Sequence, residues 1–170
     1  YGASKFAAEG YLRVFARAAG FSYAVLRPSN VFGPRQDPFG EAGVIAIFAE
    51  RMLNDDPVTI FGDGTQERDY VYVGDVVEAN LLAAGMSDGT GPNTFNIGTG
   101  VGTSVLRLFE LLAGATSYRR APTHAASRAG EVQRIYLDST RAQLKLGWYP
   151  KVGLEEGMRR TLEALRSISR

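Results

Sequence analysis

The sequence contains no cysteine and only one histidine among its 170 residues. Without cysteine the chain can form no disulfide and offers no thiolate, and we expect it to work in the cytoplasm, where disulfides are rare. One histidine and no cysteine argue against a dedicated zinc or iron site. No apolar run has the length of a membrane span and no signal peptide opens the sequence, so we expect no membrane partner.

An excess of charge of one sign is also lacking. The 19 basic residues against 18 acidic ones give a formal net charge of +1, and the arginines are dispersed rather than clustered. A nucleic-acid-binding surface needs a basic patch, so we expect no nucleic acid partner. With 170 residues, 45% of them hydrophobic, the chain is long enough and apolar enough to bury one sizeable core.

The sequence lacks the G-x-G-x-x-G pattern that binds dinucleotide phosphates between a strand and a helix. The nearest substitute, GTGVGTS at 98–104, has evenly spaced glycines, no phosphate-binding lysine and no acidic residue at the usual distance. We interpret it as a structural turn in which Thr103 or Ser104 caps the next helix. The sequence also opens inside a catalytic-looking motif without a methionine, and we expect it to be a fragment.

Segments of helical and strand periodicity alternate along the chain, which predicts an α/β fold. Gly20 is a suitable end for the first helix, and Asp75, with Glu78 three residues later, is predicted to cap the third. Asp138 is predicted to cap a short helix. The other expected helices cover about 3–19, 44–54, 76–85, 105–114 and 154–168. The expected strands cover 22–27, 58–61, 68–73, 94–97, 118–123 and 134–137. A long Gly- and Pro-rich loop at 28–43 is a candidate functional segment.

Tyr1 and Lys5 are four residues apart at the start of the first predicted helix, so both side chains face the same way. A phenol normally loses its proton near pKa ~10. A nearby ammonium favours the phenolate, so we expect Lys5 to lower the pKa of Tyr1 and make it a proton acceptor for a substrate hydroxyl. A solvated helix face with no chemical role is the alternative.

Five segments resemble the NAD-dependent epimerase/dehydratase family, the extended short-chain dehydrogenases, and within it the bacterial UDP-glucose 4-epimerases. They read YGASKFAAE, LRPSNVFGPRQDP, GEAGVIAIFAERML, VTIFGDGTQERDYVYVGDV and RAGEVQRIYLD, in family order. The resemblance implies that residues 1–170 are one C-terminal fragment of an extended Rossmann-type enzyme. That fragment would hold the end of the parallel sheet and the small nucleotide-sugar-binding α/β domain, with the N-terminal Rossmann half missing.

The resemblance also implies a reaction and a cofactor. Tyr1 would be the acid/base, and Lys5 would hold the nicotinamide ribose of NAD. UDP-glucose and UDP-galactose would interconvert through a transient 4-keto sugar, with NAD carrying the hydride. The backbone at Pro28 and Ser29 would lie near the nicotinamide, beyond the carboxyl end of the preceding strand.

A UDP-sugar site is implied for the remaining candidates. Asn30 would bind the nucleotide sugar, or else only support its turn. The resemblance implies that Arg68 and Arg128 clamp the diphosphate, and the guanidinium group of arginine pairs well with phosphate. The alternative is that both are surface arginines without a partner. Phe61 would hold the uracil unless it belongs to the core. The implied substrate-binding residues are Asn30, Gly43, Val44, Thr59, Phe61, Arg68, Arg128 and Glu131.

Three functions stay open. The first is a nucleotide-sugar 4-epimerase acting as a homodimer, with the isolated 170 residues inactive. The second is a 4,6-dehydratase or a UDP-glucuronate decarboxylase of the same family, although GPRQDPFGEAG at 33–43 favours the epimerases. The third is a non-catalytic module that binds a nucleotide or associates with itself. Ile135 matches a family position that limits the size of the sugar, but its intermediate bulk leaves N-acetyl sugars undecided.

Overall fold

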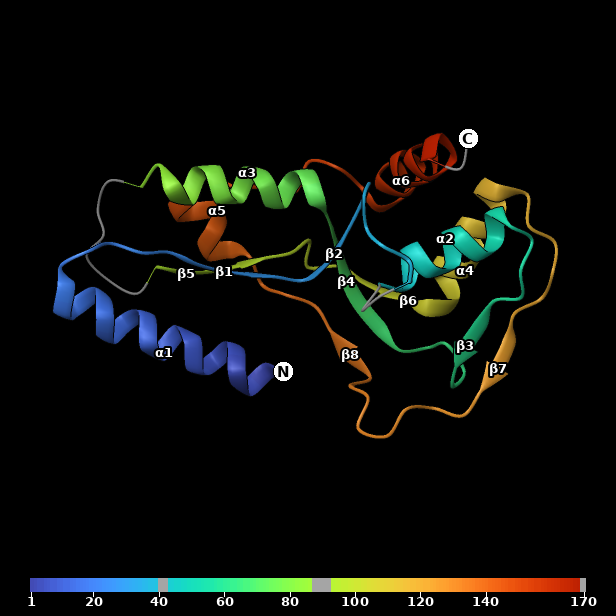
Figure 1. Ribbon diagram of the computed structural model, residues 1–170, viewed down its shortest axis with the longest axis horizontal. Coiled ribbons are helices and arrows are strands. Elements are labelled where there is room, and N and C mark those ends of the chain that lie inside the picture. The colour runs from blue at the N-terminus through green and yellow to red at the C-terminus, as the bar shows by residue number, and fades with distance from the viewer. Residues whose placement is uncertain (40–42, 87–92, 169–170) are drawn as a thin grey trace.

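The computed structural model describes residues 1–39, 43–86 and 93–168, and Figure 1 shows the order of their elements. The helices are α1 (Gly2–Ala19), α2 (Val44–Leu53), α3 (Val73–Ala84), α4 (Val105–Thr116), α5 (Thr140–Leu146) and α6 (Leu154–Ile168). The strands are β1 (Val25–Pro28), β2 (Asn30–Phe32), β3 (Thr59–Phe61), β4 (Glu67–Tyr72), β5 (Thr94–Ile97), β6 (Gly102–Ser104), β7 (Thr123–Ala125) and β8 (Arg134–Ile135).

One lobe is built on the parallel pair β1 and β5, with Val25 opposite Thr94 and Pro28 opposite Ile97. Figure 1 shows α1 on one side of this pair and α3 on the other. The guanidinium of Arg27 on β1 donates to both carboxylate oxygens of Glu9, which ties α1 to the strand. The core of this lobe consists of Val71, Ala79, Phe95, Ile97, Ala142, Leu146 and Trp148.

The second lobe holds α2, α4 and α6 with the parallel pair β3 and β7. A central sheet in the order β2–β4–β6 lies between the lobes, with β8 also paired to β4. Strands β2 and β4 run parallel, and β4 and β6 run antiparallel. The buried core of the second lobe consists of Phe32, Ile45, Phe48, Ala49, Met52, Val58, Ile60, Tyr70, Leu108, Phe109, Leu112, Tyr118, Met158 and Leu162.

Strand β4 contributes to both cores. Successive side chains on a strand point to opposite faces, and accordingly Tyr70 packs in the second lobe while Val71 packs in the first. Both residues are buried. The candidate site lies at the junction of the two lobes, where the carboxyl end of β1, strand β2 and the middle of β4 meet.

Several local predictions agree with the structure. Helix α1 ends at Gly20, whose φ of 72° is the left-handed conformation that glycine adopts without strain. The hydroxyl of Ser104 accepts a hydrogen bond from the backbone N–H of Arg107 and caps α4, as predicted. Trp148 is fully buried, as expected of a packing residue. The predicted cap at Asp138 is one residue too early: its Oδ1 accepts the N–H of Thr140, but the N-cap of α5 is Ser139.

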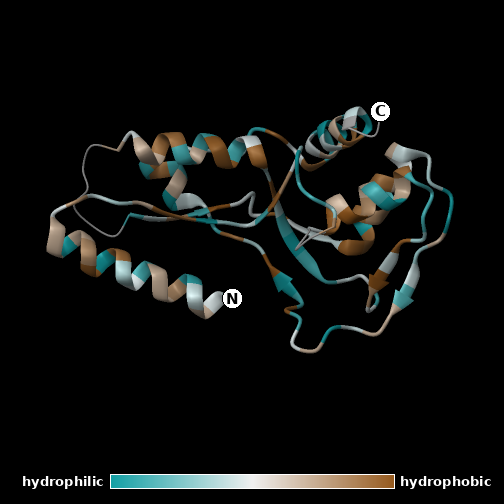
Figure 2. Ribbon diagram, in the orientation of Figure 1, coloured by the Kyte–Doolittle hydropathy of each residue, from teal (hydrophilic) through white to brown (hydrophobic). Residues whose placement is uncertain are grey.

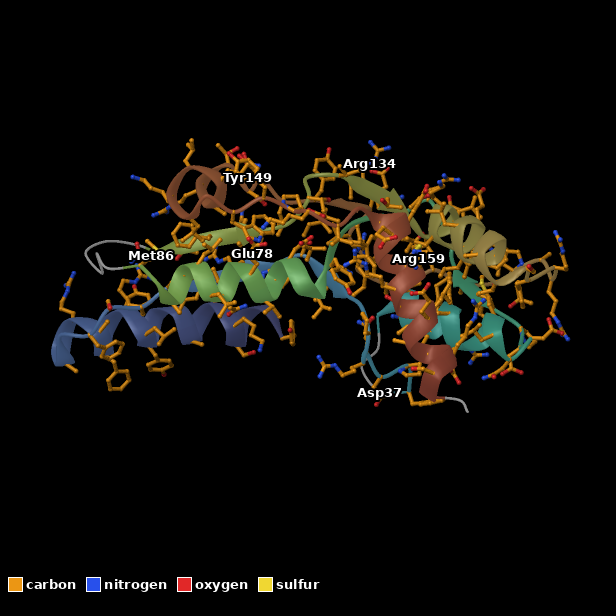
Figure 3. All side chains as sticks on the ribbon, turned by 90° about the horizontal axis from the view of Figure 1, so that it is seen from above. Asp37, Glu78, Met86, Arg134, Tyr149 and Arg159 are labelled. Atoms are coloured by element: carbon orange, nitrogen blue, oxygen red, sulfur yellow. The ribbon has the colours of Figure 1, made fainter. Side chains whose placement is uncertain are left out.

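The predicted cap at Asp75 is wrong. Helix α3 begins at Val73 with Tyr72 as its N-cap, so Asp75 already lies in the first turn. Its buried carboxylate accepts the backbone N–H groups of Lys151 and Val152. This long-range contact fastens the segment before α6 to α3. A second contact between the same segments is the ion pair of Lys151 with Glu78, which lies on α3 (Figure 3).

Three strand predictions need correction. Asn30–Phe32 forms strand β2, although 28–43 was expected to be a loop; the pairing of β2 with β4 supplies hydrogen bonds that local sequence does not reveal. Strand β7 covers Thr123–Ala125 rather than 118–123, because its backbone pairs with β3 from Thr59 onwards. Gly102–Ser104 is strand β6, which was expected to be part of a turn.

Helix α1 exposes much of its apolar surface. Only Ala16 is buried, whereas the large side chains on the outer face lie in solvent. These exposed residues include Phe6, Tyr11, Leu12, Val14 and Phe15. Figure 2 shows hydrophobic residues along α1 as well as on α3. Among the described residues, no helix combines the length and the apolarity that a membrane crossing requires.

Candidate active site

A cavity of about 540 Å³ lies at the carboxyl ends of β1 and β2, next to the N-terminus of α2 and to β4. This is the place where open α/β sheets bind ligands. The residues around it are Tyr1, Pro28, Ser29, Asn30, Val31, Phe32, Gln36, Gly43, Val44, Ile45, Asp69, Tyr70, Ile135 and Leu137. Six of the predicted site residues therefore border one cavity, as does Ile135.

Tyr1 and Lys5 lie on the same side of α1, as their spacing predicts. The ammonium of Lys5 lies 5.3 Å from the centre of the Tyr1 ring, over its face. The backbone oxygen of Tyr1 accepts the N–H of Lys5 and the hydroxyl of Ser4, which fixes the first turn. The Tyr1 side chain is 91% exposed and borders the cavity, so its hydroxyl is accessible to a bound molecule.

Pro28 and Ser29 continue from β1 into the cavity wall. The N–H of Ser29 donates to Ile97 O at 2.9 Å, which holds this backbone against β5. The hydroxyl of Ser29 is buried without a hydrogen-bond partner among the described residues. Asn30 lies in strand β2 opposite Tyr70, with its residue surface exposed, and not in a turn. Both residues thus present polar groups at the junction of the lobes.

The N-terminus of α2 forms the opposite wall. Gly43 is the N-cap of α2, and a Cβ there would lie 2.8 Å from Nε2 of Gln36. A larger residue at this position would therefore have to move the end of the Gln36 side chain. Val44, the next residue, borders both this cavity and a smaller neighbouring one.

The smaller cavity has a volume of about 180 Å³ and holds four more of the predicted residues. Thr59 and Phe61 are exposed on one side of β3 while Ile60 between them is buried. Phe61 is 38% exposed, so the alternative that it belongs to the core is wrong. The residues around this cavity are Val44, Ile47, Phe48, Thr59, Ile60, Phe61, Gln66, Val105, Arg128 and Glu131.

Of the two predicted arginines, Arg128 borders this smaller cavity and Arg68 contacts a residue that borders it. The guanidinium of Arg128 lies 4.3 Å from the centre of the Phe61 ring, in cation–π geometry. Arg68 Nη2 donates to Glu131 Oε1 at 3.3 Å, and Glu131 borders the same cavity as Arg128. Arg68 itself does not border the cavity; its Nη1 also donates to the backbone oxygen of Glu67. The partners of the two arginines, Phe61 and Glu131, line the same cavity. The two arginines therefore do not lie on opposite sides of the molecule.

Residues that the sequence did not single out also border the main cavity. Asp69 is buried and accepts hydrogen bonds from Thr99, Gly100 and Leu137. Burial raises the pKa of the Tyr70 phenol to about 12, so Tyr70 stays protonated at neutral pH. The side-chain oxygen of Gln36 is buried and finds no hydrogen-bond partner within the described part of the chain. An acidic residue inside the apolar run DYVYV is the one sequence signal that pointed to Asp69.

The described residues contain no group of three His, Asp or Glu side chains able to hold a metal ion. The arrangement is that of an α/β protein with one cavity beside a helix N-terminus and a cationic, aromatic cavity next to it.

Comparison with known proteins supports that class. Residues 1–98 match the NAD dependent epimerase/dehydratase family, and the chain belongs to this family. It is similar to the UDP-glucose 4-epimerase of Mycolicibacterium smegmatis, at 45% identity over 99% of this chain and 53% of that protein. The chain spans about half the length of the curated relatives it matches.

Solved structures give the same result and confirm the expected fold class. The UDP-glucose 4-epimerase of Thermotoga maritima with UDP-glucose is 54% identical, with a TM-score of 0.95 over 100% of this chain and 54% of that one. The Thermus thermophilus UDP-glucose 4-epimerase in complex with NAD is 44% identical, with a TM-score of 0.86 over 98% of this chain and 53% of that one.

The family depends on NAD, and the main cavity has features that fit the nicotinamide end of that cofactor. Tyr1 and Ser29 border one cavity at the carboxyl end of β1, where the phenol of Tyr1 is exposed and the buried hydroxyl of Ser29 has no hydrogen-bond partner among the described residues. Lys5 adds a cation beside the phenol. The 170 residues contain no G-x-G-x-x-G sequence for the cofactor's pyrophosphate, so this fit concerns the nicotinamide end alone.

Proposed function

We propose that the complete protein is a nucleotide-sugar 4-epimerase that interconverts UDP-glucose and UDP-galactose. The observation that carries this proposal is the pair of neighbouring cavities that share Val44. One has the accessible phenol of Tyr1, which suits proton transfer at a sugar hydroxyl. The other has an aromatic face and cations, which suit a uridine diphosphate.

The individual roles follow from the chemistry of each group. Tyr1 takes the proton of the sugar 4-hydroxyl and returns it, while Lys5 beside it binds the nicotinamide ribose. Pro28 and Ser29 hold the nicotinamide, and NAD supplies the chemistry of removing and restoring a hydride. Tyr70 stays protonated near neutral pH, so it can donate a hydrogen bond in the cavity but cannot compete with Tyr1 as the base.

The substrate would lie across both cavities. Asn30, Gly43 and Val44 contact the sugar and the nucleotide along the shared wall, and Thr59 and Phe61 hold the uracil. Arg68 and Arg128 bind the diphosphate as planar donors. Glu131 binds the ribose hydroxyls.

A 4,6-dehydratase or decarboxylase of the same family is the second candidate. The identities of 44–54% to proteins named UDP-glucose 4-epimerase favour the first. The motif GPRQDPFGEAG, which also favours the epimerases, lies partly outside the described residues, at 40–42. We also propose that the protein acts as a homodimer through the exposed apolar face of α1.

The test is turnover of UDP-glucose by the complete protein with NAD, measured as formation of UDP-galactose. Replacing Tyr1→Phe removes the proton acceptor and is expected to lower kcat about 10²–10⁴-fold while UDP still binds. Tyr149→Phe is the matched control, because Tyr149 is an exposed tyrosine away from the cavities (Figure 3). Full activity of the Tyr1 variant would refute the role of Tyr1; formation of a 4-keto-6-deoxy sugar or of a decarboxylated sugar instead would favour the second candidate.

A further inference from the structure

The side chains proposed to bind the nucleotide at the smaller cavity contact one another in the free protein. The guanidinium of Arg128 lies 4.3 Å from the centre of the Phe61 ring, where a flat base would stack. Arg68 is paired with Glu131, the group suited to ribose hydroxyls. Each proposed phosphate-binding cation therefore contacts a side chain proposed to bind the nucleoside.

Arg128 borders both cavities through which Phe61 can be approached. Phe61 borders the cavity of about 180 Å³ and, with Gly62 and Asp63, a second one of about 390 Å³. Arg128 and Glu131 border both of these cavities as well. A base that approaches Phe61 through either cavity thus meets the Arg128 guanidinium, which is a flat group of its own that stacks well on aromatic faces.

A phosphate is a stronger partner for arginine than an aromatic ring is. An exposed cation–π contact is a weak interaction, whereas a bidentate pair of arginine with phosphate is charge-assisted and geometrically matched. The diphosphate of a bound nucleotide would draw Arg128 away from Phe61 and Arg68 away from Glu131. The Phe61 ring and the Glu131 carboxylate would then be free to contact the nucleoside.

We infer that Arg128 is a specificity-determining residue that makes binding of the base depend on the diphosphate. In the free protein its guanidinium covers Phe61, so a nucleoside without phosphates must displace it with no compensating contact. A nucleoside diphosphate supplies that contact and uncovers the ring. This inference rests on the proposed UDP-sugar site, and it explains how such a site would reject free nucleosides.

The test compares uridine with UDP on the complete protein by titration calorimetry, with uridine measured by its displacement of UDP. Arg128→Ala is expected to weaken UDP binding about tenfold or more, through the loss of a hydrogen-bonded charge. The same change is expected to strengthen uridine binding about two- to fivefold, because the competing cation–π contact is gone. Arg120→Ala is the control, since Arg120 is an exposed arginine paired with Asp55 and should change neither affinity.

Two further variants sharpen the test. Arg128→Gln removes the charge with less change in size, so it should reproduce both shifts if Arg128→Ala folds poorly. In a Phe61→Leu background there is no ring to uncover, and Arg128→Ala should no longer strengthen uridine binding. Unchanged or weaker uridine binding in the Arg128 variants, with UDP still bound by the unaltered protein, would overturn this inference alone. Failure of the unaltered protein to bind UDP would overturn the proposed function and the inference with it.

Discussion

At the scale of single residues, the carboxylate of Asp69 joins three separate segments at the main cavity. Asp69 is 1% exposed and accepts four hydrogen bonds, two from Thr99 and one each from Gly100 and Leu137. A buried charge is tolerated only when such donors satisfy it. Its neighbour Arg68 points to Glu131 instead, so the two adjacent side chains serve different parts of the site.

Replacing Asp69→Asn should destabilise the protein by about 2–4 kcal/mol. The amide nitrogen would face backbone N–H donors, and each buried donor left without an acceptor costs about 1–3 kcal/mol. Urea unfolding measures the change. Asp37→Asn is the matched control, because Asp37 is exposed (Figure 3) and its carboxylate accepts the N–H of its near neighbour Phe39, so the effect should stay within about 0.5 kcal/mol. Equal effects of the two substitutions on the free energy of unfolding would contradict the role of the Asp69 carboxylate as a buried acceptor that stabilises the fold.

At the scale of elements, α6 packs closely against β2 through a glycine. A Cβ at Gly157 would lie 2.6 Å from the Phe32 ring, which is closer than real Cβ atoms approach other heavy atoms. Phe32 belongs to β2, the strand that the sequence did not predict. The close contact of α6 with β2 thus requires both the glycine in the helix and the strand that positions the Phe32 ring.

Gly157→Ala and Gly114→Ala should change stability in opposite directions. Alanine favours a helix by up to about 1 kcal/mol over glycine. At Gly157 in α6 the overpacking against Phe32, about 1–3 kcal/mol, should exceed that gain and lower the melting temperature. At Gly114 in α4 a Cβ meets nothing within 4 Å, so the melting temperature should rise. Thermal unfolding followed by circular dichroism measures both melting temperatures. A higher melting temperature for both variants would contradict the prediction and show that α6 can shift away from Phe32.

At the scale of the whole molecule, the arrangement in two lobes places the candidate site between two separate cores. Strand β4 links them, since Tyr70 and Val71 pack on opposite sides. Helix α1 lies on the outside of one lobe (Figure 1) and carries hydrophobic residues along its length (Figure 2). Several of its large apolar side chains are exposed. Such a surface is typical of a contact with another polypeptide.

We expect the complete protein to be a dimer in solution, and Phe15→Glu on α1 to shift it toward the monomer. Phe15 is 61% exposed and lies one helical turn from Tyr11, on the exposed apolar face. A charge there would have to be desolvated in the contact. Light scattering across a concentration series measures the change, with Leu144→Glu, an exposed apolar position on α5, as control. A monomeric unaltered protein would rule out the proposed homodimer.

The sequence by itself determined the features that depend on neighbours a few residues apart. The helical spacing put Tyr1 and Lys5 on one side of α1, and strand alternation put Thr59 and Phe61 on one side of β3. Gly20 and Ser104 ended and began their helices as predicted. These features follow from backbone periodicity and capping, which act within one or two turns of chain.

Only the tertiary structure decided the features that join distant segments. Arg68 meets Glu131 across 63 residues of sequence, and Asp75 binds the backbone of Lys151 rather than capping its own helix. Strand β2 exists because β4 lies beside it, and Phe61 is covered by Arg128 rather than by the core. Such contacts depend on how the lobes pack, and local periodicity carries no information about which distant side chain will be the partner.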